Sequence, residues 1–198
     1  MIVVLFGPEA SGKMTIGKEL EKLANFNLLY NHQIIDLVGN VFNKENIGTL
    51  WNFKETHIGL IADLYEKFLK FAIDNNENLV FTITWNFNNE GMKNFFLDIQ
   101  SYAKQKKVPI LFVELFSTLE ERLKRNNTPL RLENKVCKRD VKASNELLIA
   151  CTKELRLNSS RENGEMDCFT NYLYVDNTYL QPNDVANSIL KYIVENLI

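Results

Sequence analysis

Five short apolar runs recur along the chain, and each contains β-branched or aromatic side chains. They cover residues 2–6 (IVVLF), 27–31 (NLLYN), 79–84 (LVFTIT), 109–116 (PILFVELF) and 172–175 (YLYV). A strand that is buried on both faces of a sheet reads as a continuous apolar run, whereas a half-exposed strand alternates with polar residues. The pattern therefore predicts five buried strands.

The segments between these runs have apolar residues at helical spacing. The first segment shows this spacing at Ile16, Leu20, Leu23 and Ala24, and a long one extends from about 54 to 73. Further helices are predicted at about 34–42, 89–105, 118–126, 139–156 and 183–197. Buried strands separated by helices predict a three-layer α/β fold, with a five-stranded, mostly parallel sheet and helices on both faces. Ligands of such sheets bind at the carboxyl ends of the strands.

Two polar stretches interrupt this alternation. Residues 125–139 (RNNTPLRLENKVCKR) are basic and contain a proline, and we predict a mobile functional loop there. Residues 158–167 (NSSRENGEMD) contain no aromatic residue and no motif spacing, so we interpret them as a solvated connector.

The composition narrows the class of protein. A chain of 198 residues fits one domain of ordinary size, 1–198, with a sizeable core. Its 45% hydrophobic residues, 24% charged residues and net charge of -2 argue against disorder, a nucleic-acid partner and a polybasic membrane-binding surface. The expected partner is therefore a small molecule, and the number of subunits stays open.

Cysteine usage and the opening apolar run bear on location. Cys137, Cys151 and Cys168 are odd in number and lack metal-ligand spacing, which indicates a reducing compartment, with the cytoplasm as the simplest prediction. The opening run MIVVLF is too short for a signal peptide or a membrane span.

The stretch FGPEASGKMT, residues 6–15, carries the strongest chemical signal. It approximates the phosphate-binding loop G-x-x-x-x-G-K-[ST], between a predicted strand and a predicted helix. Gly7 would let the chain leave the strand sharply, Gly12 would let the backbone approach a phosphate, and Lys13 would add a mobile positive charge. The N–H groups of residues 10–15 would face the anion at the positive end of the helix. The predicted phosphate-binding residues are Gly7, Ala10, Ser11, Gly12, Lys13, Met14 and Thr15. The alternative is a tight turn with an ordinary surface lysine.

Met14 stands where the motif usually has a serine or threonine hydroxyl for Mg²⁺, so direct ligation at that position is lost. The sequence GPEASGKMT resembles the loop of adenylate kinases and other nucleoside monophosphate kinases. In that loop a glycine follows the lysine, and a threonine comes next. The resemblance implies that Thr15 lies near the α phosphate of ATP and that Mg²⁺ is held largely through water.

A basic segment follows the fourth predicted strand and contains Arg122, Lys124, Arg125, Arg131, Lys135, Lys138 and Arg139. Phosphoryl transfer spreads negative charge that arginines on a closing loop can stabilise, and Arg122 and Arg125 would share one helix face. We predict that Arg122, Arg125 and Arg139 act with Lys13 on the transition state; a solvated basic surface is the alternative.

This arrangement is similar to the lid of adenylate, shikimate and gluconate kinases, and residues 174–190 (YVDNTYLQPNDVANSIL) resemble the last strand, adenine-side loop and final helix of the same P-loop kinases. The combination of GKMT with RLENKVCKRD also resembles bacterial proteins assigned to the small, shikimate-kinase-like P-loop kinases. These resemblances imply the P-loop NTPase fold with a mobile basic lid at about 125–139.

The acceptor side departs from that pattern. The second and third predicted strands end in YNHQ and TITWN, without the carboxylate that small kinases often place there. Asn31, His32 and Gln33 replace the shikimate kinase aspartates, so shikimate is disfavoured as a substrate. The nearest acids are Asp36, which is either functional or solvent-facing, and Glu114, which is either paired with a Lys or Arg or a functional buried acid.

Two further residues are candidates for binding the acceptor. His32 could bind an anionic substrate or act as a base, or it could be structural. Trp85, at the tip of the third strand, would face the acceptor pocket, or it would pack beside Trp51 and Phe53. The predicted substrate-binding residues are thus His32, Asp36 and Trp85.

The sequence therefore predicts a kinase that transfers the γ phosphate of ATP, with Mg²⁺, to an unidentified small metabolite. An ATP-binding regulatory or interaction module with little turnover is the alternative, suggested by Met14 and the missing strand-tip acids. A GTPase is less favoured because the chain has no N-K-x-D guanine motif.

Overall fold

The structure is a computed structural model that describes residues 1–42, 53–129 and 140–197. Within these ranges five strands form one sheet in the order β2-β3-β1-β4-β5, and every neighbouring pair is parallel. The strands are β1 (Ile2–Phe6), β2 (Asn27–Tyr30), β3 (Leu79–Ile83), β4 (Ile110–Phe116) and β5 (Tyr172–Asp176). The predicted strands are confirmed to within one residue at each end, and the sheet is wholly rather than mostly parallel.

The helices lie in the segments where helical spacing predicted them. They are α1 (Lys13–Ala24), α2 (Asn31–Phe42), α3 (Glu55–Asp74), α4 (Glu90–Gln105), α5 (Leu119–Asn126), α7 (Val141–Glu154) and α8 (Pro182–Asn196), with a short 3-10 helix, η4, at Arg161–Asn163. Helix α2 starts directly after β2 rather than near residue 34. The polar residues there resemble a loop, but the Gln33 side chain accepts a 2.9 Å hydrogen bond from the backbone N–H of Tyr30 and so caps the helix.

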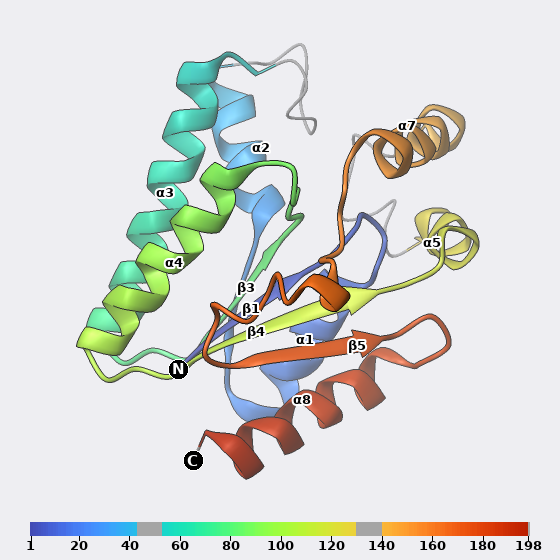
Figure 1. The fold of residues 1–198 in the computed structure, drawn as a ribbon. Coiled ribbons are helices and arrows are strands. Elements are labelled where there is room, and N and C mark those ends of the chain that lie inside the picture. Colours follow the sequence, from blue (N-terminus) through green and yellow to red (C-terminus); the bar gives the residue numbers. More distant parts are fainter. Residues whose placement is uncertain (43–52, 130–139, 198) are drawn as a thin grey trace.

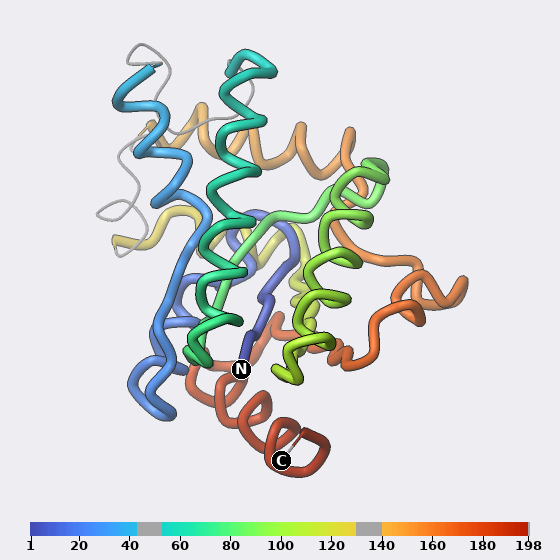
Figure 2. The backbone as a smooth tube through the Cα atoms, turned by 90° about the vertical axis from the view of Figure 1, so that its left-hand side faces the viewer, coloured from blue at the N-terminus to red at the C-terminus, as the bar shows by residue number. Residues whose placement is uncertain are grey.

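Strand β1 lies at the centre of the sheet, and its side chains alternate between two cores. Ile2, Val4 and Phe6 belong to the core formed with α2, α3 and α4, whereas Val3 and Leu5 belong to the core formed with α1 and α8. Because all five residues are fully buried, the strand reads as a continuous apolar run. Figure 1 shows the resulting three layers, and Figure 2 shows α2, α3 and α4 side by side over one face.

Helices α5 and α7 lie beyond the carboxyl ends of the strands and pack against each other (Figure 1). Buried Asn126 of α5 joins them, because its Nδ2 donates hydrogen bonds to Ser144 Oγ (2.9 Å) and Asn145 Oδ1 (2.8 Å) of α7. The two helices flank the segment predicted as the lid. Residues 130–139 of that segment, including Arg139, lie outside the described residues.

The segment 158–167 is more than the solvated connector that we predicted. Met166 is buried in the core that α4 helps to form, and Asn158 and Ser159 bind the buried carboxylate of Glu114. The polar sequence of this segment does not reveal these contacts, because its partners lie far away in the chain.

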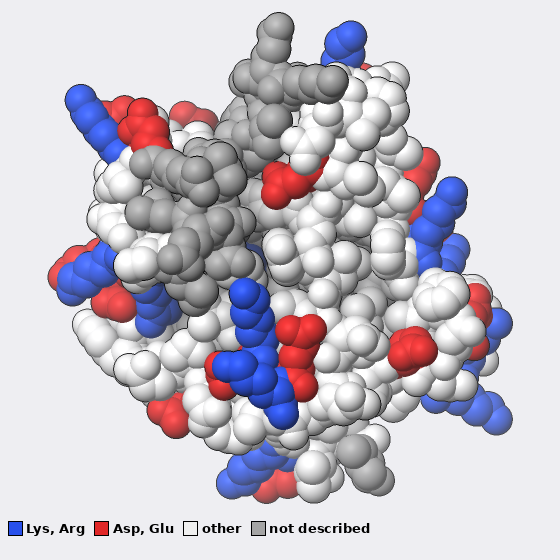
Figure 3. All heavy atoms as spheres, turned by 180° about the vertical axis from the view of Figure 1, so that it is seen from behind, with Lys and Arg blue, Asp and Glu red and all other residues white. Residues whose placement is uncertain are grey.

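Figure 3 shows acidic and basic side chains interspersed on the face of the molecule opposite to that in Figure 1. Among the described helices, none is long and apolar enough to span a membrane.

Candidate active site

The glycine loop between β1 and α1 has the backbone that its sequence predicted. Gly7 has φ 141°, and a Cβ atom placed on it would lie 2.4 Å from the carbonyl oxygen of Leu115 in the neighbouring strand β4. Gly12, directly before α1, has φ 93°. L side chains rarely adopt either conformation, so both glycines are required by the backbone. Ala10 also has a positive φ, 59°, within the same turn.

The N-terminus of α1 opens into a cavity that lies above this loop. No side chain caps the helix, and its first residues Lys13, Met14 and Thr15 line the cavity. The first N–H groups of a helix have no intrahelical acceptor and carry the positive end of its dipole. Ser11 adds a hydroxyl that is buried and has no hydrogen-bond partner within the described chain. A phosphate group fits this set of donors.

Lys13 folds back over the loop that carries it. Its Nζ donates hydrogen bonds to the carbonyl oxygens of Gly7 (2.6 Å) and Pro8 (2.7 Å). These bonds hold the ammonium group beside the open helix end, where it can bind the same anion as the N–H groups.

Asn177, which follows β5, fastens the loop from behind. Its buried side chain donates a 2.7 Å hydrogen bond to the carbonyl of Ser11 and accepts one from Ser117 Oγ at 3.2 Å. The glycine loop is thereby joined to the ends of β4 and β5. The sequence analysis did not single out Asn177; its position directly after the last strand was the available signal.

Arg125 belongs to the same network. Its guanidinium donates to Ser117 Oγ (2.9 Å) and to the carbonyls of Asn177 and Thr178 (2.8 Å each), and it pairs with Glu121 at 3.1 Å. It also lines the cavity, close to Gly12. Arg125 thus lines the cavity and supports the 177–178 turn, and its predicted role in catalysis stays a prediction.

Arg122, three residues earlier, lies in a different environment. Its side chain is 4% exposed and donates to the carbonyls of Ser117 (3.2 Å) and Glu9 (3.5 Å) and to Thr152 Oγ1 (3.0 Å). Burial lowers its pKa, and the nearby Glu9 carboxylate opposes this shift. Arg122 lines a smaller hollow behind the loop instead of the large cavity. A direct role in catalysis stays a prediction, as it does for Arg139.

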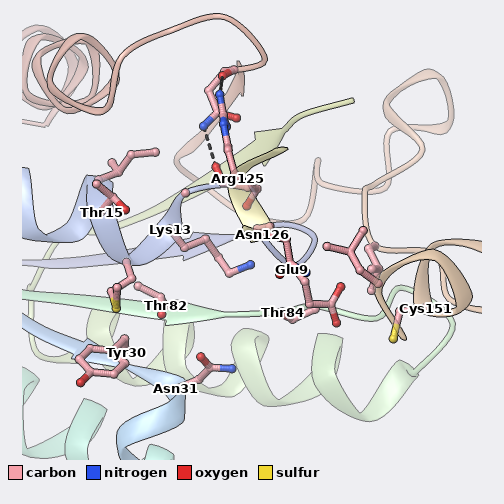
Figure 4. A pocket seen from close by; sticks show the side chains of 18 of the residues that line it. Glu9, Lys13, Thr15, Tyr30, Asn31, Thr82, Thr84, Arg125, Asn126 and Cys151 are labelled. Atoms are coloured by element: carbon pink, nitrogen blue, oxygen red, sulfur yellow. Dashed lines mark hydrogen bonds between the residues drawn. The ribbon is translucent and has the colours of Figure 1, made fainter. Parts of the chain in front are cut away.

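The cavity has a volume of about 1030 Å³ and extends from the glycine loop across the carboxyl ends of the strands (Figure 4). One wall is formed by the turn after β5, residues 177–182, where the resemblance to P-loop kinases places adenine. The opposite wall carries side chains from the ends of β2 and β3, all without formal charge apart from the titratable His32: Tyr30, Asn31, His32, Thr82, Thr84 and Asn86. The cavity therefore has room for a nucleotide and a second molecule.

Of the residues predicted to bind the acceptor, some line the cavity and others do not. His32 lines the cavity, as expected from its position at the tip of β2. Asp36 lies one turn further along α2, half-buried, and is absent from the cavity wall formed by the described residues. Burial raises the pKa of Tyr65, and the nearby charge of Asp36 adds to the shift. The binding roles of His32 and Asp36 stay predictions.

Trp85 requires a correction, because it does not face the cavity. Its side chain is 1% exposed and stacks on Phe87 (centroid distance 5.0 Å) and Phe96 (4.8 Å), with Phe6 and Phe169 also in contact range. The packing alternative is therefore the one that the structure supports. The neighbour that we expected at 51 lies outside the described residues. The strand-end rule failed here because an aromatic core extends past the end of β3 and takes up the indole.

Glu114 also has partners other than those expected. No lysine or arginine pairs with it in the described chain; instead it accepts hydrogen bonds from Asn158 Nδ2 (2.8 Å), the Ser159 N–H (2.9 Å), Ser159 Oγ (2.6 Å) and Tyr172 Oη (2.7 Å). Burial, together with the bond to Glu114, raises the pKa of Tyr172. Four donors explain how a fully buried carboxylate is tolerated. Glu114 therefore holds the 158–159 segment on the sheet.

Glu9 lines the cavity and was missed by the sequence analysis. Figure 4 shows its carboxylate pointing into the cavity near Thr84. Its Oε2 atom is buried and has no hydrogen-bond partner among the residues described. Its position inside the glycine loop was the available signal, since side chains of that loop stand close to bound phosphate.

The residues that could hold Mg²⁺ are few. Within the described ranges no group of three His, Cys, Asp or Glu side chains forms a metal-ligand cluster. Met14 offers no oxygen, and the Thr15 residue beside it lines the cavity. This donor set fits an ion that keeps most of its water shell, as Mg²⁺ readily does.

Comparison with solved structures gives matches over nearly the whole chain. A gluconokinase from Sinorhizobium meliloti matches with a TM-score of 0.59 and 12% identity over 98% of this chain and 91% of that one. Shikimate kinase from Acinetobacter baumannii, solved with shikimate, has a TM-score of 0.56 and 19% identity over 100% and 94%. A sugar kinase from a Janibacter species has 0.55 and 10% over 98% and 94%. Neither a protein-family model nor a curated protein matches the sequence.

These neighbours share the parallel sheet and the flanking helices with this chain over almost their full length, despite low identity. Together with the glycine loop between β1 and α1, they establish the architecture that the sequence predicted. The chain has the fold of the P-loop NTPase kinases.

Proposed function

We propose that this protein is an ATP-dependent phosphotransferase that acts on a small molecule. The observation that carries the proposal is that the glycine loop, the open end of α1 and the polar tips of β2 and β3 line one cavity. A phosphate cradle and a polar wall in one cavity would allow a nucleotide and an acceptor to meet. The kinases among the structural neighbours support the same reaction class.

In this proposal each part of the loop has one task. The N–H groups at the start of α1 and the Ser11 hydroxyl bind the β and γ phosphates, and Lys13 exchanges its bonds to Gly7 and Pro8 for the phosphate oxygens. Mg²⁺, when bound, would neutralise charge on those phosphates, and Thr15 is the residue that would hold it, through water. Arg125 lies at the phosphate side and can stabilise the charge of the transition state. Arg122 and Arg139 complete the proposed set of catalytic residues. The proposed location of the protein is the cytoplasm.

The test begins with nucleotide binding. Lys13→Ala is expected to weaken ATP binding by roughly ten- to a hundredfold, because a hydrogen bond to a charged group contributes about 1.5–3 kcal/mol. Isothermal titration calorimetry with ATP measures the affinity, and circular dichroism checks the fold. The matched control is Lys191→Ala on exposed α8, which should bind ATP like the wild type. Equal affinity and turnover in Lys13→Ala and the wild type would contradict a phosphate-binding loop.

Transfer is tested separately, by following ATP consumption with nucleosides, nucleotides, sugars, sugar acids and aminoglycosides. One positive acceptor establishes the kinase.

A second function, an ATP-binding module with little turnover, is favoured by two specific features. The tips of β2 and β3 carry Asn31 and Thr84 where small kinases often have an acid, and Met14 removes the usual metal ligand. Tight ATP binding by the wild type without transfer or hydrolysis in the whole screen would make this module the better assignment.

A further inference from the structure

A kinase must accommodate the proton that the acceptor hydroxyl loses. The strand tips that surround the acceptor side of the cavity offer neutral groups, among them Tyr30, Asn31 and Thr84. We infer that Glu9, inside the glycine loop, supplies the missing carboxylate: it binds the acceptor hydroxyl and takes its proton. This inference rests on the proposed kinase function and adds the residue and the class of acceptor.

The environment of the Glu9 carboxylate favours this role. Glu9 Oε2 is buried and has no hydrogen-bond partner in the described part of the chain, although the side chain reaches the cavity. A buried carboxylate oxygen without a donor is costly. A hydroxyl group brought by a ligand would satisfy it.

The other acidic side chains near this end of the sheet differ from Glu9 in their partners. Glu114 has four donors and is fully buried, so it holds the chain together. Glu121, which also lines the cavity, is paired with Arg125 at 3.1 Å. Glu9 is thus the cavity-lining acid of the described residues that has a buried carboxylate oxygen without a hydrogen-bond donor.

The position of Glu9 relative to the glycine loop and Lys13 supports the same role. Figure 4 shows Lys13 between Thr15 on one side and the Glu9 carboxylate on the other, near Thr84 of the β3 end. Thr15 marks the side where the nucleotide phosphates and Mg²⁺ are proposed to bind. Glu9 therefore lies on the acceptor side of the phosphate that Lys13 would hold.

Charge around the acceptor side indicates the class of acceptor. The lysine and arginine that line the cavity in the described chain, Lys13 and Arg125, both belong to the phosphate side. The Glu9 carboxylate is the charge that faces the cavity on the opposite side, because the nearby Arg122 is buried and lines the smaller hollow; this carboxylate would repel an anionic acceptor. The acceptor is therefore an uncharged or cationic molecule with a hydroxyl group, such as a nucleoside, a neutral sugar or an aminoglycoside.

The step is a transfer of one proton and one phosphoryl group. The acceptor oxygen forms a bond to the γ phosphorus of ATP while the bond from that phosphorus to the bridging β,γ oxygen breaks, and the electron pair of the broken bond leaves with ADP. The acceptor proton passes to the Glu9 carboxylate, which releases it to water after the products leave. General base catalysis of this kind contributes about 10²–10⁴-fold to a rate.

The experiment compares Glu9→Gln with the wild type, using ATP, Mg²⁺ and two acceptor panels. One panel contains uncharged and cationic hydroxyl compounds, and the other contains nucleoside monophosphates and sugar acids. We expect the wild type to phosphorylate members of the first panel only. Glu9→Gln should lower kcat by roughly a hundredfold or more. It keeps the shape of the side chain and removes a negative charge near the phosphates, so ATP should bind as tightly as before or more tightly.

Glu195→Gln makes the same chemical change on an exposed carboxylate at the end of α8 and should leave kcat unchanged. A merely structural role for Glu9 would lower ATP affinity and thermal stability along with kcat, and this would overturn the inference. Restoration of the wild-type rate in Glu9→Gln at high Mg²⁺ would make Glu9 a metal-positioning residue and overturn it as well.

The remaining outcomes separate the inference from the proposed function. An active wild type with an equally active Glu9→Gln variant leaves the kinase in place and rejects the role of Glu9. A wild type that phosphorylates only the anionic panel rejects the class of acceptor. A wild type that binds ATP but neither transfers nor hydrolyses phosphate rejects the kinase itself, and the role of Glu9 with it.

Discussion

At the residue scale, Gly7 determines how the chain leaves the sheet. A side chain at this position would need a backbone conformation of φ 141° and would place its Cβ 2.4 Å from the Leu115 carbonyl. Backbone strain of this kind costs about 1–3 kcal/mol even before the clash is counted. We therefore expect Gly7→Ala to lower the free energy of unfolding by about 2 kcal/mol or more, as measured by urea denaturation.

Gly59 of α3 provides the matched control. A Cβ atom there would meet nothing within 4 Å, and a helix interior favours alanine over glycine by about 0.5–1 kcal/mol. Gly59→Ala should raise the free energy of unfolding slightly. If both variants had the same stability as the wild type, the strand-to-loop geometry described here would be wrong.

Met14 is the residue at which the loop departs most from the usual motif. Met14→Ser restores a hydroxyl beside the phosphates and should lower the Mg²⁺ concentration for half-maximal turnover by about fivefold, as expected for a polar contact of about 1 kcal/mol. Kinetics at saturating ATP and varied Mg²⁺ measure this. Met14→Ala removes the thioether without adding an oxygen, so an identical Mg²⁺ response in both variants would refute the account of the missing ligand.

At the element scale, α5 contains two arginines for which the sequence predicted the same role. In the structure they lie in different surroundings. Arg122 points behind the glycine loop, whereas Arg125 reaches the cavity and the turn after β5. Helical spacing placed both on the same side of the helix, but their partners come from Ser117 after β4, from α7 and from the 177–178 turn, which no local pattern identifies.

Arg125→Ala is expected to lower kcat by roughly tenfold or more, with a smaller change in ATP affinity, because a charge contact in a closed site acts mainly on the transition state. Loss of its bonds to Asn177 and Thr178 should also lower thermal stability. Steady-state kinetics and ATP titration measure the first two effects. The same kinetic result is predicted for Arg139→Ala, in the part of the 125–139 segment that the structure does not describe.

Lys124→Ala is the control on the same helix, because Lys124 is exposed and pairs with Glu120 at the surface. It should turn over ATP like the wild type. Wild-type kinetics in both arginine variants would instead favour the solvated basic surface over a lid.

At the scale of the whole molecule, the cavity joins the ends of β1, β2, β3 and β5 with α5 and α7. A ligand that binds only the folded chain stabilises it as a whole, by about 2.7 kcal/mol at a concentration one hundred times its Kd. For a chain of this size we expect Mg²⁺ and ATP to raise the melting temperature by about 5–10 °C. Differential scanning fluorimetry measures the shift, which should be largely lost in Lys13→Ala.

GTP at the same concentration should give a smaller shift, in line with the absence of an N-K-x-D motif from the sequence. An equal shift with GTP would remove the preference for adenine, and no shift with either nucleotide would count against the cavity as a nucleotide site.

The sequence by itself determined the strands, most helix limits and the glycine loop. These features depend on local chemistry: apolar runs must be buried on both faces, and Gly7 and Gly12 occupy backbone conformations, φ 141° and 93°, that L side chains rarely adopt. The regular alternation of strand and helix then leaves a parallel sheet as the architecture that buries every run. For the same reason, the sequence predicted a cavity beside the glycine loop at the carboxyl ends of the strands.

Only the tertiary structure decided which side chains reach that cavity. Trp85 does not line the cavity because its indole packs in an aromatic core. Glu114 is buried and accepts hydrogen bonds from four donors in distant segments. Glu9 became a candidate because no group of the described chain satisfies one of its oxygens. Contacts between residues far apart in the chain depend on how the elements pack, and the spacing of residues along the sequence carries no record of that packing.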